Sequence, residues 1–174
     1  MNRILFSAII FSFYSCTTNN SVNTGEEYAL VHSINLATYS VQQAFIHELA
    51  NDIQKLKDDN NIDFDIKKLQ VLMDTAQKIN KSRIVLLQSV KQSDNLIKFR
   101  DKSLYSATLF DSAYNSVFKT CIEILNTKGE IRIELIREKV VPTLTEIQQS
   151  VDNAKLAGTE MRTKYNIIVE DQLP

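Results

Sequence analysis

Residues that interrupt helices are nearly absent from this sequence. Its 174 residues include three glycines and two prolines. Strand-rich domains need a turn about every eight to twelve residues, usually marked by Gly, Pro or Asn-Gly. Long stretches without such marks favour uninterrupted helices. A chain of this length is expected to form one domain that buries roughly 70% of its unfolded surface. The sequence therefore predicts an all-α domain.

Apolar residues recur at steps of three and four along four segments, which predicts four amphipathic helices. The first is expected over residues 26–57 and the second over 65–92. The third ends at Asn126, and its start is left open because an apolar run follows directly on the loop at residues 93–95. The apolar stripe of the first helix is Leu30, Ile34, Ala37, Val41, Phe45, Leu49, Ile53 and Leu56.

The fourth segment is the longest and contains Pro142, which removes one backbone hydrogen bond. Its stripe keeps its phase from Ile133 to Tyr165, so we expect a kink at Pro142 rather than a domain boundary. Residues 130–135 also alternate as a strand would, but no partner strand is evident. Four long helices joined by short loops predict an up-down-up-down four-helix bundle.

The first sixteen residues form a separate unit. Arg3 precedes an apolar run at residues 4–14. As a helix this run would be ~16 Å long, about half the hydrocarbon thickness of a bilayer, which predicts a secretory signal. It ends in Phe13-Tyr14-Ser15-Cys16, which resembles the bacterial lipobox. The resemblance implies cleavage before Cys16 and acylation of its thiol and new amine. The alternative is an ordinary secretory signal with a chance cysteine.

These features divide the chain into a signal peptide at 1–15, a lipidated polar tether at 16–25 and a helical domain at 26–174. Lipidation of Cys16 leaves Cys121 as the second of two cysteines, so the mature chain has no intramolecular disulfide. Cys121 lies on an apolar stripe. We expect it to be a small buried hydrophobe rather than a reactive thiol.

Charged residues of both signs are mixed along the chain, with a formal net charge of −1. This pattern predicts a solvated surface laced with ion pairs. It argues against a nucleic-acid partner, which would require a basic stripe.

No catalytic, cofactor-binding or metal-binding residue is predicted. His32 and His47 lie fifteen residues apart on one predicted helix, so ~22 Å separates them and they cannot share a metal. His47 begins a run like a zinc-protease helix, but Asn51 stands where the second histidine belongs. A di-iron bundle would need glutamates three residues before each histidine, where the chain has Ala29 and Ala44.

Two other patterns leave alternatives open. Tyrosines at helical spacing could line a pocket, but a place in the core or at its rim is favoured for Tyr28, Tyr39, Tyr105, Tyr114 and Tyr165. Asp74-Thr75-Ala76 and Asp111-Ser112-Ala113 resemble sites glycosylated in some exported bacterial proteins. Whether either is modified stays open.

The mature chain resembles a loose set of small, all-helical bacterial surface lipoproteins with no established activity. The resemblance rests on Cys16, on the four-helix layout and on the ending Glu160-Met161-Arg162-Thr163-Lys164-Tyr165-Asn166. It implies a protein of the bacterial cell envelope, anchored in the outer membrane or at the cell surface through lipid on Cys16. We expect a non-enzymatic binding or interaction module, with an envelope protein as candidate partner. The alternative is a ligand-binding sensor-like or accessory subunit of an envelope complex.

Overall fold

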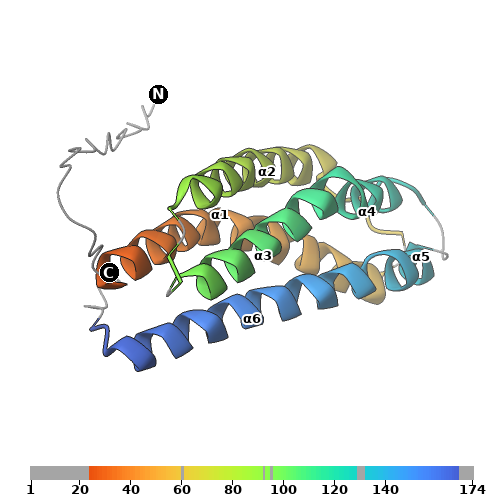
Figure 1. Cartoon of the computed structure of the whole chain (residues 1–174). Helices are drawn as coiled ribbons and strands as arrows, with labels where there is room; N and C mark the ends of the chain where they lie inside the picture. Colours follow the sequence, from red (N-terminus) through yellow and green to blue (C-terminus); the bar gives the residue numbers. More distant parts are fainter. Residues whose placement is uncertain (1–23, 60, 92, 95, 129–131, 169–174) are drawn as a thin grey trace.

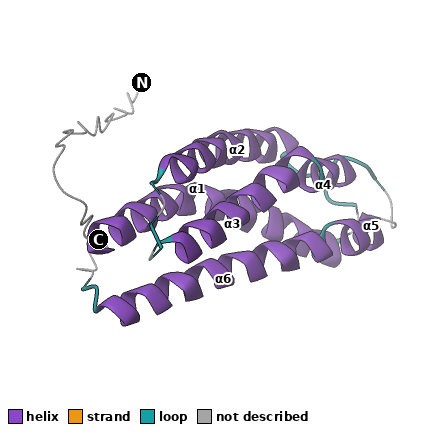
Figure 2. Cartoon of the chain, in the orientation of Figure 1, coloured by secondary structure: helices purple, strands orange, loops and turns teal. Residues whose placement is uncertain are grey.

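The computed structural model describes residues 24–59, 61–91, 93–94, 96–128 and 132–168. Helices joined by short connections make up these residues, and no strand occurs among them (Figure 2). The all-α prediction is confirmed for this part of the chain. The helices are α1 (Thr24–Asp58), α2 (Ile66–Ser89), α3 (Ile97–Asn115), α4 (Val117–Leu125), α5 (Arg132–Lys139) and α6 (Val141–Tyr165).

The long helices pack side by side (Figure 1). Helix α1 lies against α2, α2 against α3, and α3 against α6, whereas α1 touches α6 less extensively. The start of α1 and the end of α6 lie at the same end of the molecule, called the near end below (Figure 1). Helices α4 and α5 lie at the opposite, far end.

The ends of the first two helices agree closely with the sequence. Helix α1 covers Thr24–Asp58 where residues 26–57 were expected, so its first two residues fall inside the predicted tether. Its first turn carries Glu26 and Glu27, which favour the positive end of the helix dipole. Helix α2 covers Ile66–Ser89 where residues 65–92 were expected.

The third predicted helix is divided into α3 and α4 by Ser116, whose φ of −131° and ψ of −79° are not helical. Two side chains compete for backbone carbonyls at this point. The Nδ2 of Asn115 donates to the carbonyl of Asp111 at 2.7 Å, and the hydroxyl of Ser116 donates to the carbonyl of Ser112 at 2.8 Å. These local bonds accompany a one-residue break that the apolar periodicity does not show.

The fourth predicted segment is also divided, into α5 and α6, which meet at Val140. Pro142 lies in the first turn of α6. The N–H groups of a first turn have no acceptor within their own helix, so a proline is well tolerated there. The N–H of Val140 still donates to the carbonyl of Ile136 at 2.9 Å, and the N–H of Leu144 donates to the carbonyl of Val140 at 3.1 Å. Residues 132–135 are helical, so the strand alternative fails there. The kink at Pro142 stays a prediction.

The apolar interior consists of two clusters. The larger lies toward the far end around three aromatic rings, with the Phe45 centroid 5.1 Å from that of Phe118 and 5.8 Å from that of Tyr114. The smaller lies at the near end, where Tyr28 stacks on Phe99 at 5.3 Å between centroids. The apolar stripes of the helices therefore build two cores rather than one.

The stripe of α1 is only partly the buried face. Leu30 and Ala37 are exposed and Val41 is half-buried, although all three belong to the predicted stripe. Thr38 and Gln42 are buried instead. The interior face of α1 therefore includes these polar residues: Gln42 donates to Asn80 on α2, and the hydroxyl of Thr38 donates to the carbonyl of Asn35 within α1.

Gly158 supplies a stability test of the near-end packing. A Cβ at this position would lie 3.0 Å from Cε2 and 3.2 Å from Cζ of Phe99, whose ring is buried against Tyr28. We expect Gly158→Val to lower the free energy of unfolding by about 1–3 kcal/mol through overpacking.

Chemical denaturation of the variant and of Thr159→Val, an exposed neighbour on the same helix, measures the effect. The control should stay within ~0.5 kcal/mol of the parent. Equal stability of the two variants would contradict the close contact between α3 and α6.

Candidate functional site

A band of buried polar side chains separates the two apolar clusters. We call it the polar layer, and it comes from facing turns of α1, α2 and α3. All its members except the half-buried Asn35 are at most 6% exposed. They are Asn35, Thr38, Gln42, Asn80, Arg83, Ser103 and Ser106.

Asn80 joins three helices within this layer. Its Oδ1 accepts a hydrogen bond from Nε2 of Gln42 on α1 at 2.9 Å. Its Nδ2 donates to the carbonyl of Ala107 on α3 at 2.8 Å. Because Asn80 is fully buried on α2, each bond replaces one that water would otherwise make. The pair of bonds fixes how the three helices are aligned along their axes.

Arg83 places a positive charge one turn from Asn80. Its Nε and one terminal nitrogen donate to Oδ1 of Asn35 at 3.1 and 2.9 Å. Asn35 in turn donates to the hydroxyl of Ser103 at 2.9 Å. Burial lowers the pKa of Arg83 to about 10, with a smaller opposing effect from Tyr114, so the guanidinium is still charged at neutral pH. Arg83 makes no ion pair with any residue in the ranges that the structure describes.

Helix α3 carries two buried hydroxyls, of which that of Tyr114 interacts electrostatically with Arg83. The hydroxyls of Ser106 on α3 and Tyr114, two turns further along, are buried and have no hydrogen-bond partner among the described residues. Burial raises the pKa of Tyr114, so its hydroxyl is a neutral donor. A guanidinium with nearby hydroxyl donors is suited to recognising a small negative or hydrogen-bonding group.

The surface hollows lie elsewhere. One is lined by Thr159, Arg162, Thr163, Asn166, Ile167 and Ile168 at the near end of α6. Another is lined by Val141, Leu144, Thr145, Gln148, Gln149 and Asp152 at the start of the same helix. No residue of the polar layer lines either hollow.

The structure tests the prediction for one of the two cysteines. Cys16 lies outside the described residues, so its lipidation stays a prediction. Cys121 is a free, fully buried thiol in the larger apolar cluster, and burial raises its pKa to about 12. The expectation of a buried hydrophobe at this position is confirmed.

The histidines stay apart in the structure. His32 stacks on Tyr28 with 5.4 Å between ring centroids, whereas His47 is exposed further along α1. No group of three or more His, Cys, Asp or Glu side chains in the described ranges is placed to hold a metal ion.

The tyrosines do not gather into one pocket. Tyr28 belongs to the smaller apolar cluster and Tyr114 to the larger one, Tyr165 is half-buried, and Tyr39 and Tyr105 are exposed. The core-or-rim interpretation is confirmed for Tyr28, Tyr114 and Tyr165, whereas Tyr39 and Tyr105 are exposed on the surface.

The two glycosylation-like motifs lie within helices. Thr75 on α2 and Ser112 on α3 are exposed, and the hydroxyl of Thr75 donates to the carbonyl of Val71 at 2.7 Å. Modification of either stays a prediction. Among the helices of the described ranges, none combines the length and apolar character needed to cross a membrane.

Comparisons with protein-family models, curated proteins and solved structures gave no match to this chain.

The sequence reasoning missed the polar layer, although its signal is present. Asn80 and Arg83 continue the spacing of Ala76 and Leu87 on α2, and Gln42 lies one turn before Phe45 on α1. Extending the buried face of each helix at steps of three and four, whatever the residue type, would have located the polar layer.

Gln42 offers a direct test of the polar layer. We expect Gln42→Ala to lower the free energy of unfolding by about 1–3 kcal/mol, because it leaves the buried Oδ1 of Asn80 without its donor.

The control is Gln77→Ala on the surface. Gln77 donates to Oδ1 of Asn115 at 2.8 Å, so the same bond is removed where water can replace it. We expect a change within ~0.5 kcal/mol there. Similar losses in both variants, measured by denaturant titration, would show that the buried bond adds nothing.

Proposed function

We propose that this protein is a lipid-anchored component of the bacterial cell envelope that acts as a non-enzymatic binding or interaction module. The observation that carries the proposal is the short apolar run at residues 4–14 ending at Cys16. Residues 17–23 separate this cysteine from Thr24, the first residue of α1. A lipidation motif therefore stands directly before a folded helical bundle.

An exposed apolar pair on α1 supports an interaction role. Leu36 and Tyr39 lie one turn apart and are 46% and 47% exposed. The Nζ of Lys155 on α6 lies 6.0 Å from the centroid of the Tyr39 ring. Aromatic residues such as Tyr39 are enriched at protein interfaces, and an exposed aliphatic neighbour enlarges the apolar patch.

The alternative is a ligand-binding sensor-like or accessory subunit of an envelope complex, and the polar layer favours it. The Arg83 charge has no acidic partner in the described ranges, and the hydroxyls of Ser106 and Tyr114 have no bonds there. A small anion beside Arg83 would offset this buried charge. The interaction module is preferred because this layer is closed over by α1, α2 and α3, whereas Tyr39 is accessible.

The proposal includes an up-down-up-down course in which α3 with α4, and α5 with α6, form the third and fourth rods. The short connections and the packing of successive helices against one another support this course. A bend at Pro142 belongs to the same proposal, because proline cannot donate to the carbonyl of Glu138.

Replacement of the lipidated cysteine tests the anchor. We expect Cys16→Ser to move the protein from the membrane fraction to the soluble fraction and to abolish incorporation of labelled palmitate. Intact mass of the purified protein gives a second readout, since acyl chains add mass. A variant that still fractionates with membranes and takes up as much palmitate would exclude Cys16 as the anchor.

Site-specific photocrosslinking tests the interaction surface. A benzophenone amino acid at Tyr39 should form a discrete protein adduct in intact cells, because this ring is expected to be covered by a partner. The matched control is the same amino acid at Val85, which is 63% exposed on α2. Absence of an adduct at Tyr39, or the same adducts at both positions, would argue against this surface.

A further inference from the structure

The near end of the bundle carries an exposed aliphatic side chain directly beyond α6. Asn166 ends the helix in the left-handed conformation, with φ of 49° and ψ of 41°. The N–H of Ile167 then bonds the carbonyl of Arg162 at 3.0 Å, which closes a Schellman turn. Ile167 packs against the smaller apolar cluster, whereas Ile168 is 91% exposed. The turn thus holds Ile168 away from the core.

Basic and aromatic side chains lie in the turn of α6 that precedes this isoleucine, and Arg162 lines the same surface hollow as Ile168. Arg162 and Lys164 lie in the last turn of α6 and are exposed. The Nζ of Lys164 lies 4.8 Å from the centroid of the half-buried Tyr165 ring. Aliphatic, tyrosine and basic side chains at one site match the layers of a bilayer surface, from acyl chains through headgroups to lipid phosphates.

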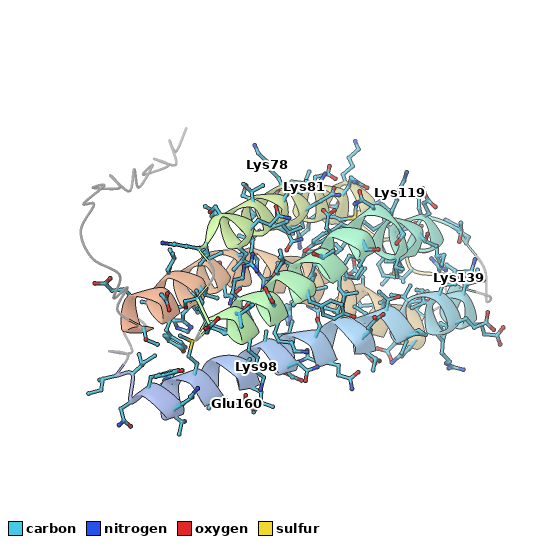
Figure 3. The ribbon with its side chains drawn as sticks, in the orientation of Figure 1. Lys78, Lys81, Lys98, Lys119, Lys139 and Glu160 are labelled. Atoms are coloured by element: carbon cyan, nitrogen blue, oxygen red, sulfur yellow. The ribbon has the colours of Figure 1, made fainter. Side chains whose placement is uncertain are left out.

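The acidic side chains of this end are partly neutralised. Glu160 pairs with Lys98 across α6 and α3, as Figure 3 shows. The buried Glu27 accepts a hydrogen bond from the hydroxyl of Ser93 at 2.7 Å. Glu26 and Asp94 are exposed. Among the residues that the structure describes, Arg162 and Lys164 make no ion pair.

Chain length restricts which end of the bundle can reach a membrane. From Cys16 to Thr24 the chain spans at most ~28 Å when fully extended. Helix α1 has 35 residues and is ~52 Å long. With the far end on the membrane, the start of α1 would be about twice as far from the bilayer as this segment can reach. The end that carries Ile168 is within reach, because α6 ends where α1 begins (Figure 1).

We propose that the near end of the bundle rests on an anionic lipid surface, with Ile168 inserted among the acyl chains and Arg162 and Lys164 at the lipid phosphates. This inference rests on the proposed lipid anchor at Cys16. One isoleucine and two basic residues bind a membrane weakly by themselves, so the contact orients a protein that the lipid already holds.

The absence of tryptophan from the chain permits a clean measurement. Full-length lipidated protein carrying Ile168→Trp is reconstituted on vesicles of phosphatidylcholine and phosphatidylglycerol with brominated acyl chains. The control is Val71→Trp, 64% exposed near the start of α2 at the far end. We expect the fluorescence of Ile168→Trp to be quenched at least roughly twofold more strongly than that of Val71→Trp.

The charges are tested in the same assay. Arg162→Glu with Lys164→Glu should lower the quenching of Ile168→Trp, because anionic lipid then repels this end. The charge-matched control is Lys78→Glu with Lys81→Glu on α2, whose side chains point away from the bundle in Figure 3. This control should leave the quenching unchanged, and equal effects of the two pairs would overturn the role of Arg162 and Lys164.

The outcomes separate this contact from the anchor. A protein that carries acyl mass and floats with the vesicles, but shows no quenching at either tryptophan, would overturn the contact alone. Equal quenching at both positions would mean that the bundle lies on its side, which also overturns the contact. A protein without acyl mass that stays off the vesicles would overturn the anchor together with the contact that depends on it.

Discussion

The hydrogen bonds of Asn80 are the constraint on which the alignment of the bundle depends. Apolar stripes favour association of helices but allow them to slide or rotate against one another with little change in buried area. Asn80 removes that freedom, because Gln42 on α1 and the carbonyl of Ala107 on α3 satisfy it only in one alignment. Leaving a fully buried amide unsatisfied would cost about 1–3 kcal/mol per group. The polar layer therefore selects one arrangement from several that the apolar residues would tolerate.

The polar layer also contains a buried positive charge. Arg83 is buried and charged, and its donors are used by Asn35 and by the carbonyl of Ser103 rather than by a carboxylate. Amide and carbonyl oxygens offset part of the desolvation of a guanidinium but do not cancel its charge. This is why the polar layer favours the alternative of a ligand-binding sensor-like or accessory subunit. Because α1, α2 and α3 close over this layer, the main proposal places recognition on the outer surface instead.

The proposed anchor, the apolar pair on α1 and the near end of α6 fit into one arrangement. A lipid at Cys16 would hold the near end at the bilayer, where Ile168 and its basic neighbours meet the lipid. The axis of the bundle would then stand away from the membrane, with Tyr39 presented along its side to other envelope proteins. In this arrangement the membrane contact supplies orientation, and the side of the bundle supplies recognition.

The sequence by itself determined the helical class, the approximate ends of the first two helices and the buried state of Cys121. Each follows from local chemistry, namely few helix breakers and the spacing of apolar residues. Sequence patterns did not reveal the break at Ser116, because the apolar spacing continues across it from Tyr114 to Cys121. Only the tertiary structure decided which face of α1 turns inward. The stripe through Ala37 and Val41 is more apolar than the face through Thr38 and Gln42, yet the second face is the buried one. Gln42 donates to Asn80 on α2, a contact that the sequence of one helix cannot reveal.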